Sequence, residues 1–249
     1  MNFIKEKQRF ILAVTIYALI YFVLTFVITD LLMLFPAFTE IVDGVEVLTP
    51  GGGALQNLIN YLLLFTGIFL SIKRDIIDDF TSFFSSRKNS IGLMLLIGIG
   101  FLVVNILTGQ VVGLLNTAFD VGPSVNQSYL GIMLQSEFGL PFAFVAILFG
   151  PIVEEMIFRK SLFNLIKNPL FAVIISSILF AIIHVGAEPT PLAFVVNSVG
   201  YLIPGVVFGL LYLRYKQNIA PIMVIHVINN LVSVLLTLLQ LSFAESSIG

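Results

Sequence analysis

Apolar runs long enough to cross a bilayer recur along almost the whole chain. A transmembrane helix needs about 20 predominantly apolar residues, because the hydrocarbon core is about 30 Å thick. Only helices and closed barrels satisfy every backbone hydrogen bond in lipid, so the sequence predicts an all-α, polytopic transmembrane helix bundle. We expect about seven spans, at residues 10–29, 55–72, 91–115, 141–166, 170–187, 192–212 and 219–240.

Composition supports this class and excludes several kinds of chemistry. Of the 249 residues, 58% are hydrophobic and 10% are charged, whereas a soluble domain has about 25% charged residues. The absence of cysteine excludes disulfides, thiol nucleophiles and thiolate metal ligands. His184 and His226 supply all the imidazole of the chain. The net charge of -2, without a basic tract, gives no indication of a nucleic-acid partner.

Lysine and arginine predict the orientation of the spans, because cytoplasmic loops accumulate these residues. With the N-terminus inside, every basic residue falls on the cytoplasmic side. We therefore expect a multi-pass protein of the cell membrane whose N-terminus is cytoplasmic and whose first apolar run is retained as an anchor. The basic residues are Lys5, Lys7, Arg9, Lys73, Arg74, Arg87, Lys88, Arg159, Lys160, Lys167, Arg214 and Lys216. The outside segments carry acids instead: Glu40, Asp43, Glu46, Asp120, Glu137, Glu188 and Glu245.

Two segments between the predicted spans have their own patterns. Residues 36–54 carry acids and three consecutive glycines, which predicts a polar loop. In residues 75–84, isoleucine and phenylalanine recur at helical spacing while three aspartates face elsewhere. This pattern is typical of an amphipathic helix, which we expect to lie along the inner membrane surface as a connecting element.

Two adjacent carboxylates and an arginine interrupt the apolar run at residues 141–166. Ionisable side chains at membrane depth are expensive and usually functional. Glu155 and Arg159 are four residues apart, so they share a helix face and can pair. Glu154 is turned by about 100° and is free to face elsewhere.

Two later runs add imidazoles and a carboxamide. Phe180 lies one helical turn before His184, and His226 lies one turn before Asn230. Each polar group in lipid needs a protein partner or a water-filled cavity. One interpretation is hydrogen bonding that merely holds helices together. For the whole set we favour a common wet pocket, since leucine and alanine would hold a bundle without the desolvation penalty.

Three ordered motifs carry a resemblance to a known family. They are Glu154-Glu155-x-x-x-Arg159, Phe180-x-x-x-His184 and His226-x-x-x-Asn230. Together they resemble the signature of the CPBP family of intramembrane proteases, the CAAX protease and bacteriocin-processing group also called Abi, which includes the type II CAAX prenyl endopeptidases. The resemblance covers about residues 139–236. It implies a catalytic helix bundle at residues 139–240, preceded by N-terminal spans and the amphipathic helix at residues 1–138.

The resemblance also implies a reaction and a role for each motif residue. Glu154 would act as general base on a water molecule, assisted by His184, while His226 and Asn230 would polarise the scissile carbonyl. The substrate would be a membrane-associated peptide or protein tail, of CAAX, pheromone or bacteriocin type. Three neighbouring residues would support the catalytic helix: Glu155, Arg159 and Phe180.

Two alternatives concern the chemistry and the class of function. Glu154, His184 and His226 could instead bind zinc, with Glu155 as base; we expect that no cofactor is required. The protein could also be a non-catalytic membrane scaffold that regulates a sensor kinase or transporter. A proton-coupled transporter is a third possibility, but the sequence lacks the inverted repeats typical of that class. The expected partners are the lipid bilayer and a membrane-associated peptide, and the sequence leaves the oligomeric state open.

The positions of the motifs along their helices lead to one further prediction about the fold. The carboxylates can reach His184 only if their helix continues past Phe163. We therefore predict an unbroken helix through about Ile166, with a site reached from the cytoplasmic half.

Overall fold

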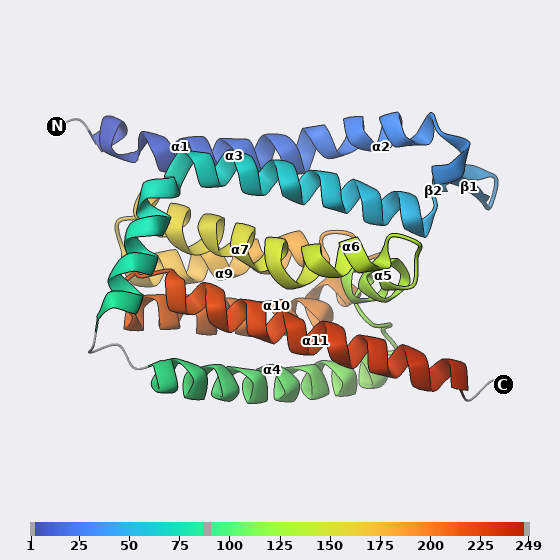
Figure 1. The fold of residues 1–249 in the computed structure, drawn as a ribbon. Coiled ribbons are helices and arrows are strands. Elements are labelled where there is room, and N and C mark those ends of the chain that lie inside the picture. The colour runs from blue at the N-terminus through green and yellow to red at the C-terminus, as the bar shows by residue number, and fades with distance from the viewer. Residues whose placement is uncertain (1–2, 87–90, 247–249) are drawn as a thin grey trace.

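The computed structural model describes residues 3–86 and 91–246. Long helices run side by side from one end of a bundle to the other (Figure 1). Among the described residues, six helices are long and apolar enough to cross a membrane: Lys7–Met33, Pro50–Ser85, Ile91–Phe119, Gly139–Leu165, Pro191–Arg214 and Ala220–Ala244. The predicted all-α multi-pass bundle is confirmed.

The expected count of about seven spans is not confirmed. The run at residues 170–187 forms α9 (Pro169–Val185), an apolar helix of 17 residues. At a rise of 1.5 Å per residue it is about 25 Å long, shorter than the hydrocarbon core. Its start is fixed by Pro169 and by Asn168, whose side chain accepts hydrogen bonds from the next backbone N–H groups.

The remaining elements follow in chain order. The first span comprises α1 (Phe3–Leu19), the π-helical turn η1 (Ile20–Leu24) and α2 (Thr25–Met33). After the third span, α4 (Ile91–Phe119), comes a short helix that the sequence did not predict, α5 (Val125–Leu134). The last two spans are α10 (Pro191–Arg214) and α11 (Ala220–Ser246).

The predicted polar loop at residues 36–54 is wrong in its first part, because these residues fold. After the 3-10 turn η2 (Pro36–Phe38), β1 (Thr39–Val42) pairs antiparallel with β2 (Val45–Leu48). The turn between them is Asp43-Gly44, both at positive φ (51° and 80°). Two such residues form the turn whose twist suits a two-residue hairpin.

The three glycines of that segment belong to the next helix. Here α3 (Pro50–Ser85) starts with proline in its first turn, and the Thr49 hydroxyl accepts a hydrogen bond from Gly52 N at 3.1 Å. A Cβ on Gly51 would overlap the carboxylate of Glu137, and one on Gly52 would lie 2.8 Å from the carbonyl oxygen of Phe38. Glycine is used here for close packing rather than for a flexible loop.

The α3 helix bends at Ile72, whose φ and ψ are -123° and 18°. Residues 73–85, which we call the elbow helix, then cross one end of the bundle (Figure 1). Ile76 and Phe83 are buried, whereas Ile77 and Phe84 are about half exposed. The predicted amphipathic helix is therefore present, as a continuation of α3, and its place on the membrane surface stays a prediction.

One unbroken helical segment carries the adjacent carboxylates. It comprises α6 (Gly139–Phe144), the π-helical η3 (Val145–Phe149), α7 (Gly150–Glu155), the π-helical η4 (Met156–Ser161) and α8 (Leu162–Leu165). The prediction of a continuous helix past Phe163 is confirmed. It ends at Ile166, which has an extended backbone.

The helix ends divide by charge as the sequence predicted. The N-terminus, the elbow helix and the α8–α9 and α10–α11 connections lie at one end of the bundle, which we call the basic end (Figure 1). The hairpin, α5 and the α9–α10 connection lie at the other, the acidic end. Which end faces the cytoplasm stays a prediction. Arg87, Lys88 and the side chains of Lys5 and Glu245 lie outside the described residues.

A single apolar core joins the N-terminal spans to the helices of the motifs. Phe10 and Leu64 belong to the same buried cluster as Phe158, Phe208 and Ile225. The division at residue 138 stays a prediction, and the helices on its two sides pack together.

Candidate active site

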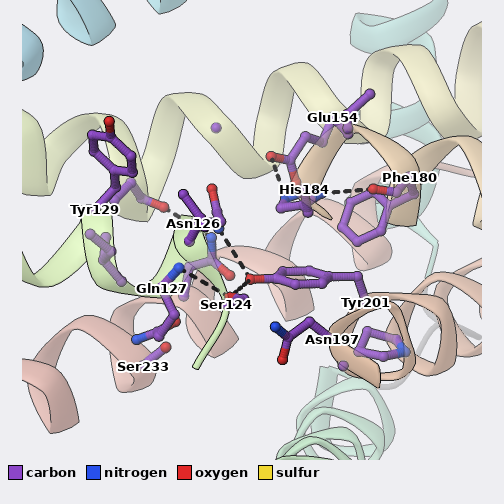
Figure 2. A pocket seen from close by; sticks show the side chains of 18 of the residues that line it. Ser124, Asn126, Gln127, Tyr129, Glu154, Phe180, His184, Asn197, Tyr201 and Ser233 are labelled. Atoms are coloured by element: carbon purple, nitrogen blue, oxygen red, sulfur yellow. Dashed lines mark hydrogen bonds and ion pairs between the residues drawn. The ribbon is translucent and has the colours of Figure 1, made fainter. Parts of the chain in front are cut away.

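Glu154 lies between the two histidines of the chain. Its Oε1 is 3.8 Å from Nε2 of His184, and its Oε2 is 3.7 Å from Nε2 of His226. The three side chains come from α7, α9 and α11, and Figure 2 shows Glu154 turned toward His184. Both distances exceed those of direct hydrogen bonds. The imidazoles therefore flank the carboxylate without closing on it.

The outer nitrogen of each imidazole has a fixed partner. His184 Nδ1 is 2.7 Å from the carbonyl oxygen of Phe180, and His226 Nδ1 is 2.8 Å from Oε1 of Glu155. Both partners can only accept, so both Nδ1 atoms carry the proton. In a neutral imidazole, Nε2 is then an acceptor that faces another acceptor, the Glu154 carboxylate. A molecule with two O–H bonds suits such a pair of acceptors.

A buried ion pair lies behind the site. Arg159 Nε is 3.3 Å from Oε2 of Glu155, as the spacing predicted, and both side chains are fully buried. The guanidinium also donates to the carbonyl oxygen of Gly205 at 3.2 Å. It lies 5.1 Å from the ring of Phe180 and 5.3 Å from that of Phe208. We call Glu155, Arg159 and these two rings the charged layer.

Aromatic rings hold both imidazoles in place. The ring centroids of Phe180 and His184 are 4.5 Å apart, as are those of Phe208 and His226. Tyr201 stacks on the other side of His184, at 4.6 Å with 21° between the planes. These contacts limit the rotation of the rings toward and away from Glu154.

A cavity of about 1100 Å³ opens in front of these groups. Besides Glu154 and the histidines, its wall carries many neutral amides: Gln56, Asn57, Asn105, Asn116, Asn126, Gln127, Asn197, Asn229 and Asn230. Since residues 123–127, 129, 130, 186 and 187 also line it, the cavity extends toward the acidic end. Access from the cytoplasmic half stays a prediction, because the structure does not fix which end faces the cytoplasm. In the structure, α5 and its preceding loop shape the cavity at the end opposite the basic end.

The mouth of this cavity is tied together by polar contacts (Figure 2). The Tyr201 hydroxyl lies 2.9 Å from the Ser124 hydroxyl and accepts a hydrogen bond from Asn126 Nδ2 at 3.2 Å. Glu188 accepts from Val125 N at 2.9 Å and from Asn197 Nδ2 at 3.1 Å. The start of α5 is thereby fastened to α10 and to the α9–α10 connection.

Asn230 lines the same cavity as the other three predicted catalytic residues, but its amide already has partners. Its Nδ2 donates to the carbonyl oxygen of Ala146 at 2.9 Å, and its Oδ1 accepts from Asn229 Nδ2 at 3.3 Å. Sequence reasoning missed Asn229, as well as Asn105, Asn197 and Tyr201. Their only signal was a polar side chain within an apolar run.

The zinc alternative places Glu154, His184 and His226 around one ion. In the part of the chain that the structure describes, no three His, Cys, Asp or Glu side chains are grouped in a way that could hold a metal. His226 is moreover engaged through Nδ1 with Glu155, and its ring orientation is set by that contact.

Comparison with known proteins finds a family model that matches these residues. Residues 136–232 match the model of a family described as type II CAAX prenyl endopeptidase Rce1-like. The matched segment is similar to that family. It contains every motif residue named above, from Glu154 to Asn230. Asn105 and Ser124 precede the Rce1-like segment, so part of the cavity wall comes from outside it.

Two curated proteins are similar to parts of the chain. The chain is 30% identical over 100 residues to an uncharacterized protein of Mycoplasma capricolum, which covers 40% of this chain and 28% of the relative. It is 32% identical over 144 residues to a Bacillus subtilis protein named "Putative membrane peptidase YdiL", which covers 55% of this chain and 54% of that protein. The chain thus spans about half or less of each relative. No solved structure matches. The Rce1-like match supports a membrane protease.

Proposed function

We propose that this protein is an integral-membrane endopeptidase that hydrolyses a peptide bond in a membrane-associated peptide or protein tail. The observation that carries the proposal is the position of Glu154, whose two carboxylate oxygens face Nε2 of His184 and of His226 on the wall of one polar cavity. The Rce1-like match to the segment that supplies all three side chains supports it.

The reaction begins with a water molecule held between Glu154 and His184. As the water oxygen bonds to the scissile carbonyl carbon, Glu154 takes its proton, and His184 accepts a hydrogen bond that orients the attacking lone pair. The carboxylic acid formed on Glu154 then donates that proton to the leaving nitrogen, and the C–N bond breaks. The same carboxyl group serves as base and then as acid, so no further proton source is needed.

The negative charge on the carbonyl oxygen needs donors from the opposite side. Asn230 has two N–H bonds on its amide, and Ala146 occupies one of them. The second is available to the oxyanion. His226, whose ring is held by the Glu155 carboxylate at Nδ1, supplies the second donor from Nε2 as an imidazolium.

The cavity wall suits an uncharged, extended peptide. Backbone N–H and C=O groups of a substrate within the membrane need partners. Carboxamides provide both a donor and an acceptor, and they carry no charge that would have to be matched by the substrate. A neutral membrane-embedded peptide is therefore the substrate that this wall favours.

The test is cleavage by purified protein in lipid nanodiscs. Labelled membrane-peptide libraries, with and without prenyl groups, would be incubated with wild type, with Glu154→Gln and with Glu40→Gln, an exposed hairpin control. We expect Glu154→Gln to lower kcat by about 10²–10⁴-fold and Glu40→Gln to have no effect. Full-rate cleavage by Glu154→Gln would overturn the proposal.

Two further arms separate the alternatives. We expect wild type treated with a zinc chelator and freed of metal to retain its cleavage rate, whereas loss of activity restored by zinc alone would establish the metal mechanism. In cells, a scaffold would keep its phenotype in Glu154→Gln at equal protein level, and a protease would lose it.

A further inference from the structure

One backbone carbonyl in the helix before Glu154 has no helical donor. In η3, the N–H of Gly150 donates to the carbonyl oxygen of Val145 rather than to that of Ala146. The following residue, Pro151, has no N–H at all. The carbonyl oxygen of Ala146 accepts instead from Asn230 Nδ2 at 2.9 Å. A carbonyl inside the bundle without a donor is costly, so this contact fixes the orientation of the Asn230 amide.

That orientation continues through two more carboxamides. Because the nitrogen of Asn230 faces Ala146, its Oδ1 turns to Asn229 and accepts from Nδ2 of that residue at 3.3 Å. The Oδ1 of Asn229 in turn accepts from Asn105 Nδ2 at 3.0 Å. Every amide in the row donates toward Ala146. A carbonyl can only accept, so the row has a single direction.

The last member of the row lies on a different helix. Asn105 belongs to α4, which packs against α10 and α11. It precedes residues 136–232, the Rce1-like segment. Asn229 is buried, and its Oδ1 has Asn105 Nδ2 as its donor. The charged layer on the other side of Glu154 takes no part in this row.

We propose that Asn105 is a positioning residue that acts through Asn229 on Asn230. By donating to Asn229, it keeps the Asn229 amide turned toward Asn230, and so keeps the second N–H of Asn230 available in the cavity. The proposal rests on the proposed function for what Asn230 does with that N–H. The hydrogen-bonded row itself does not depend on it.

The first arm of the test is kinetic and uses two leucine variants of α4. Asn105→Leu removes the donor at nearly constant size, and Asn105→Gln keeps a donor. Gln110→Leu makes a comparable change at an exposed position of the same helix that does not line the cavity. We expect Asn105→Leu to lower kcat about tenfold with KM unchanged, which corresponds to the loss of one hydrogen bond to a buried polar group. Asn105→Gln should regain most of that rate, and Gln110→Leu should change it less than twofold.

A double-mutant cycle separates positioning from packing. If Asn105 acts through Asn230, then Asn105→Leu has no further effect in an Asn230→Ala background. An equal loss in both backgrounds, or an equal loss in Gln110→Leu, would overturn the proposal. So would a drop in kcat that is accompanied by a matching drop in the unfolding temperature.

The second arm does not need cleavage. In protein labelled with ¹⁵N-asparagine, we expect Asn105→Leu to move the side-chain amide resonances of Asn229 and Asn230, and Gln110→Leu to leave them in place. If the resonances of Asn229 and Asn230 do not move in Asn105→Leu, the hydrogen-bonded row is contradicted. If wild type cleaves no peptide, the proposed function fails, and these spectra still decide whether Asn105 orients Asn230.

Discussion

Glu154 and Glu155 are neighbours in the chain but lie in two different regions. In one region the carboxylate has charged partners at short distance, and in the other it faces the cavity. Glu155 lies in the charged layer, where its carboxylate contacts Arg159 and His226 and has no exposure. Glu154 faces the cavity, and its nearest cationic or imidazole groups are 3.7 and 3.8 Å away. One step of about 100° around a helix separates a carboxylate that contacts Arg159 and His226 from one that is left to react.

The two regions also differ in how they satisfy polar groups. The charged layer excludes water and pairs each charge with a specific side chain, an arrangement that is rigid because an unpaired charge there is very unfavourable. The cavity wall uses carboxamides, which tolerate either a peptide or water as partner. The charged layer therefore keeps the catalytic side chains in position, and the cavity accepts the ligand. The predictions below test that division.

The largest effect on stability is expected in the charged layer. Glu155→Gln leaves the Arg159 guanidinium buried without a counter-charge, and should lower the free energy of unfolding by about 3–5 kcal/mol. Glu154→Gln should leave thermal unfolding in nanodiscs unchanged. Adding Arg159→Met to Glu155→Gln should recover part of the loss, since it removes the unpaired charge. Equal destabilisation by Glu155→Gln and Glu154→Gln would show that the two regions do not differ in this way.

On the cavity side, Asn230→Ala should impair chemistry rather than folding. Removal of one oxyanion donor typically lowers kcat by about 10²–10³-fold. We expect that loss in nanodisc cleavage assays, with KM changed less than threefold. Ser233→Ala, one turn further along the same cavity wall, is the matched control. A larger change in KM than in kcat would assign Asn230 to substrate binding instead.

Tyr201 joins the cavity mouth to His184, and its two contacts can be separated. Tyr201→Phe keeps the stack on His184 but removes the hydroxyl that binds Ser124 and Asn126. Tyr201→Leu removes both contacts. An aromatic stack contributes about 0.5–1.5 kcal/mol, so we expect kcat to fall by about 2–10-fold in Tyr201→Leu and to stay near wild type in Tyr201→Phe. Equal rates in the two variants would show that the stack does not position His184.

The smallest effect is expected at the basic end, where the helix of the carboxylates meets the elbow helix. Lys160 Nζ lies 2.5 Å from Oδ2 of Asp79, and both side chains are only partly accessible. Lys160→Met should lower the free energy of unfolding by about 1 kcal/mol, measured beside Lys73→Met as an exposed control. A loss as large as that of Glu155→Gln would mean that this end also belongs to the rigid region.

The sequence was sufficient to predict that the motifs converge. Each polar pair is conspicuous within a long apolar run, and helical spacing defines the helix face on which it lies. The direction of the cavity could not be predicted, since the sequence indicated no element between the spans at 91–115 and 141–166, where α5 (Val125–Leu134) lies. The row of amides depends on a π-helical turn followed by Pro151, and spacing alone does not reveal an unpaired carbonyl. The hairpin did have a signal, the Asp43-Gly44 turn, which is typical of two-residue hairpins.

The elbow helix carries no motif, yet one of its carboxylates contacts two of the three helical segments whose motifs meet. Asp79 Oδ2 accepts from Lys160 Nζ, six residues after Glu154, and from Ile219 N at 3.0 Å, seven residues before His226. Sliding either helix by one residue would displace its reactive group by about 1.5 Å along the axis. A segment at the rim of the bundle, about 9 Å of helix away from Glu154, therefore sets the axial register of the base against its imidazole partner.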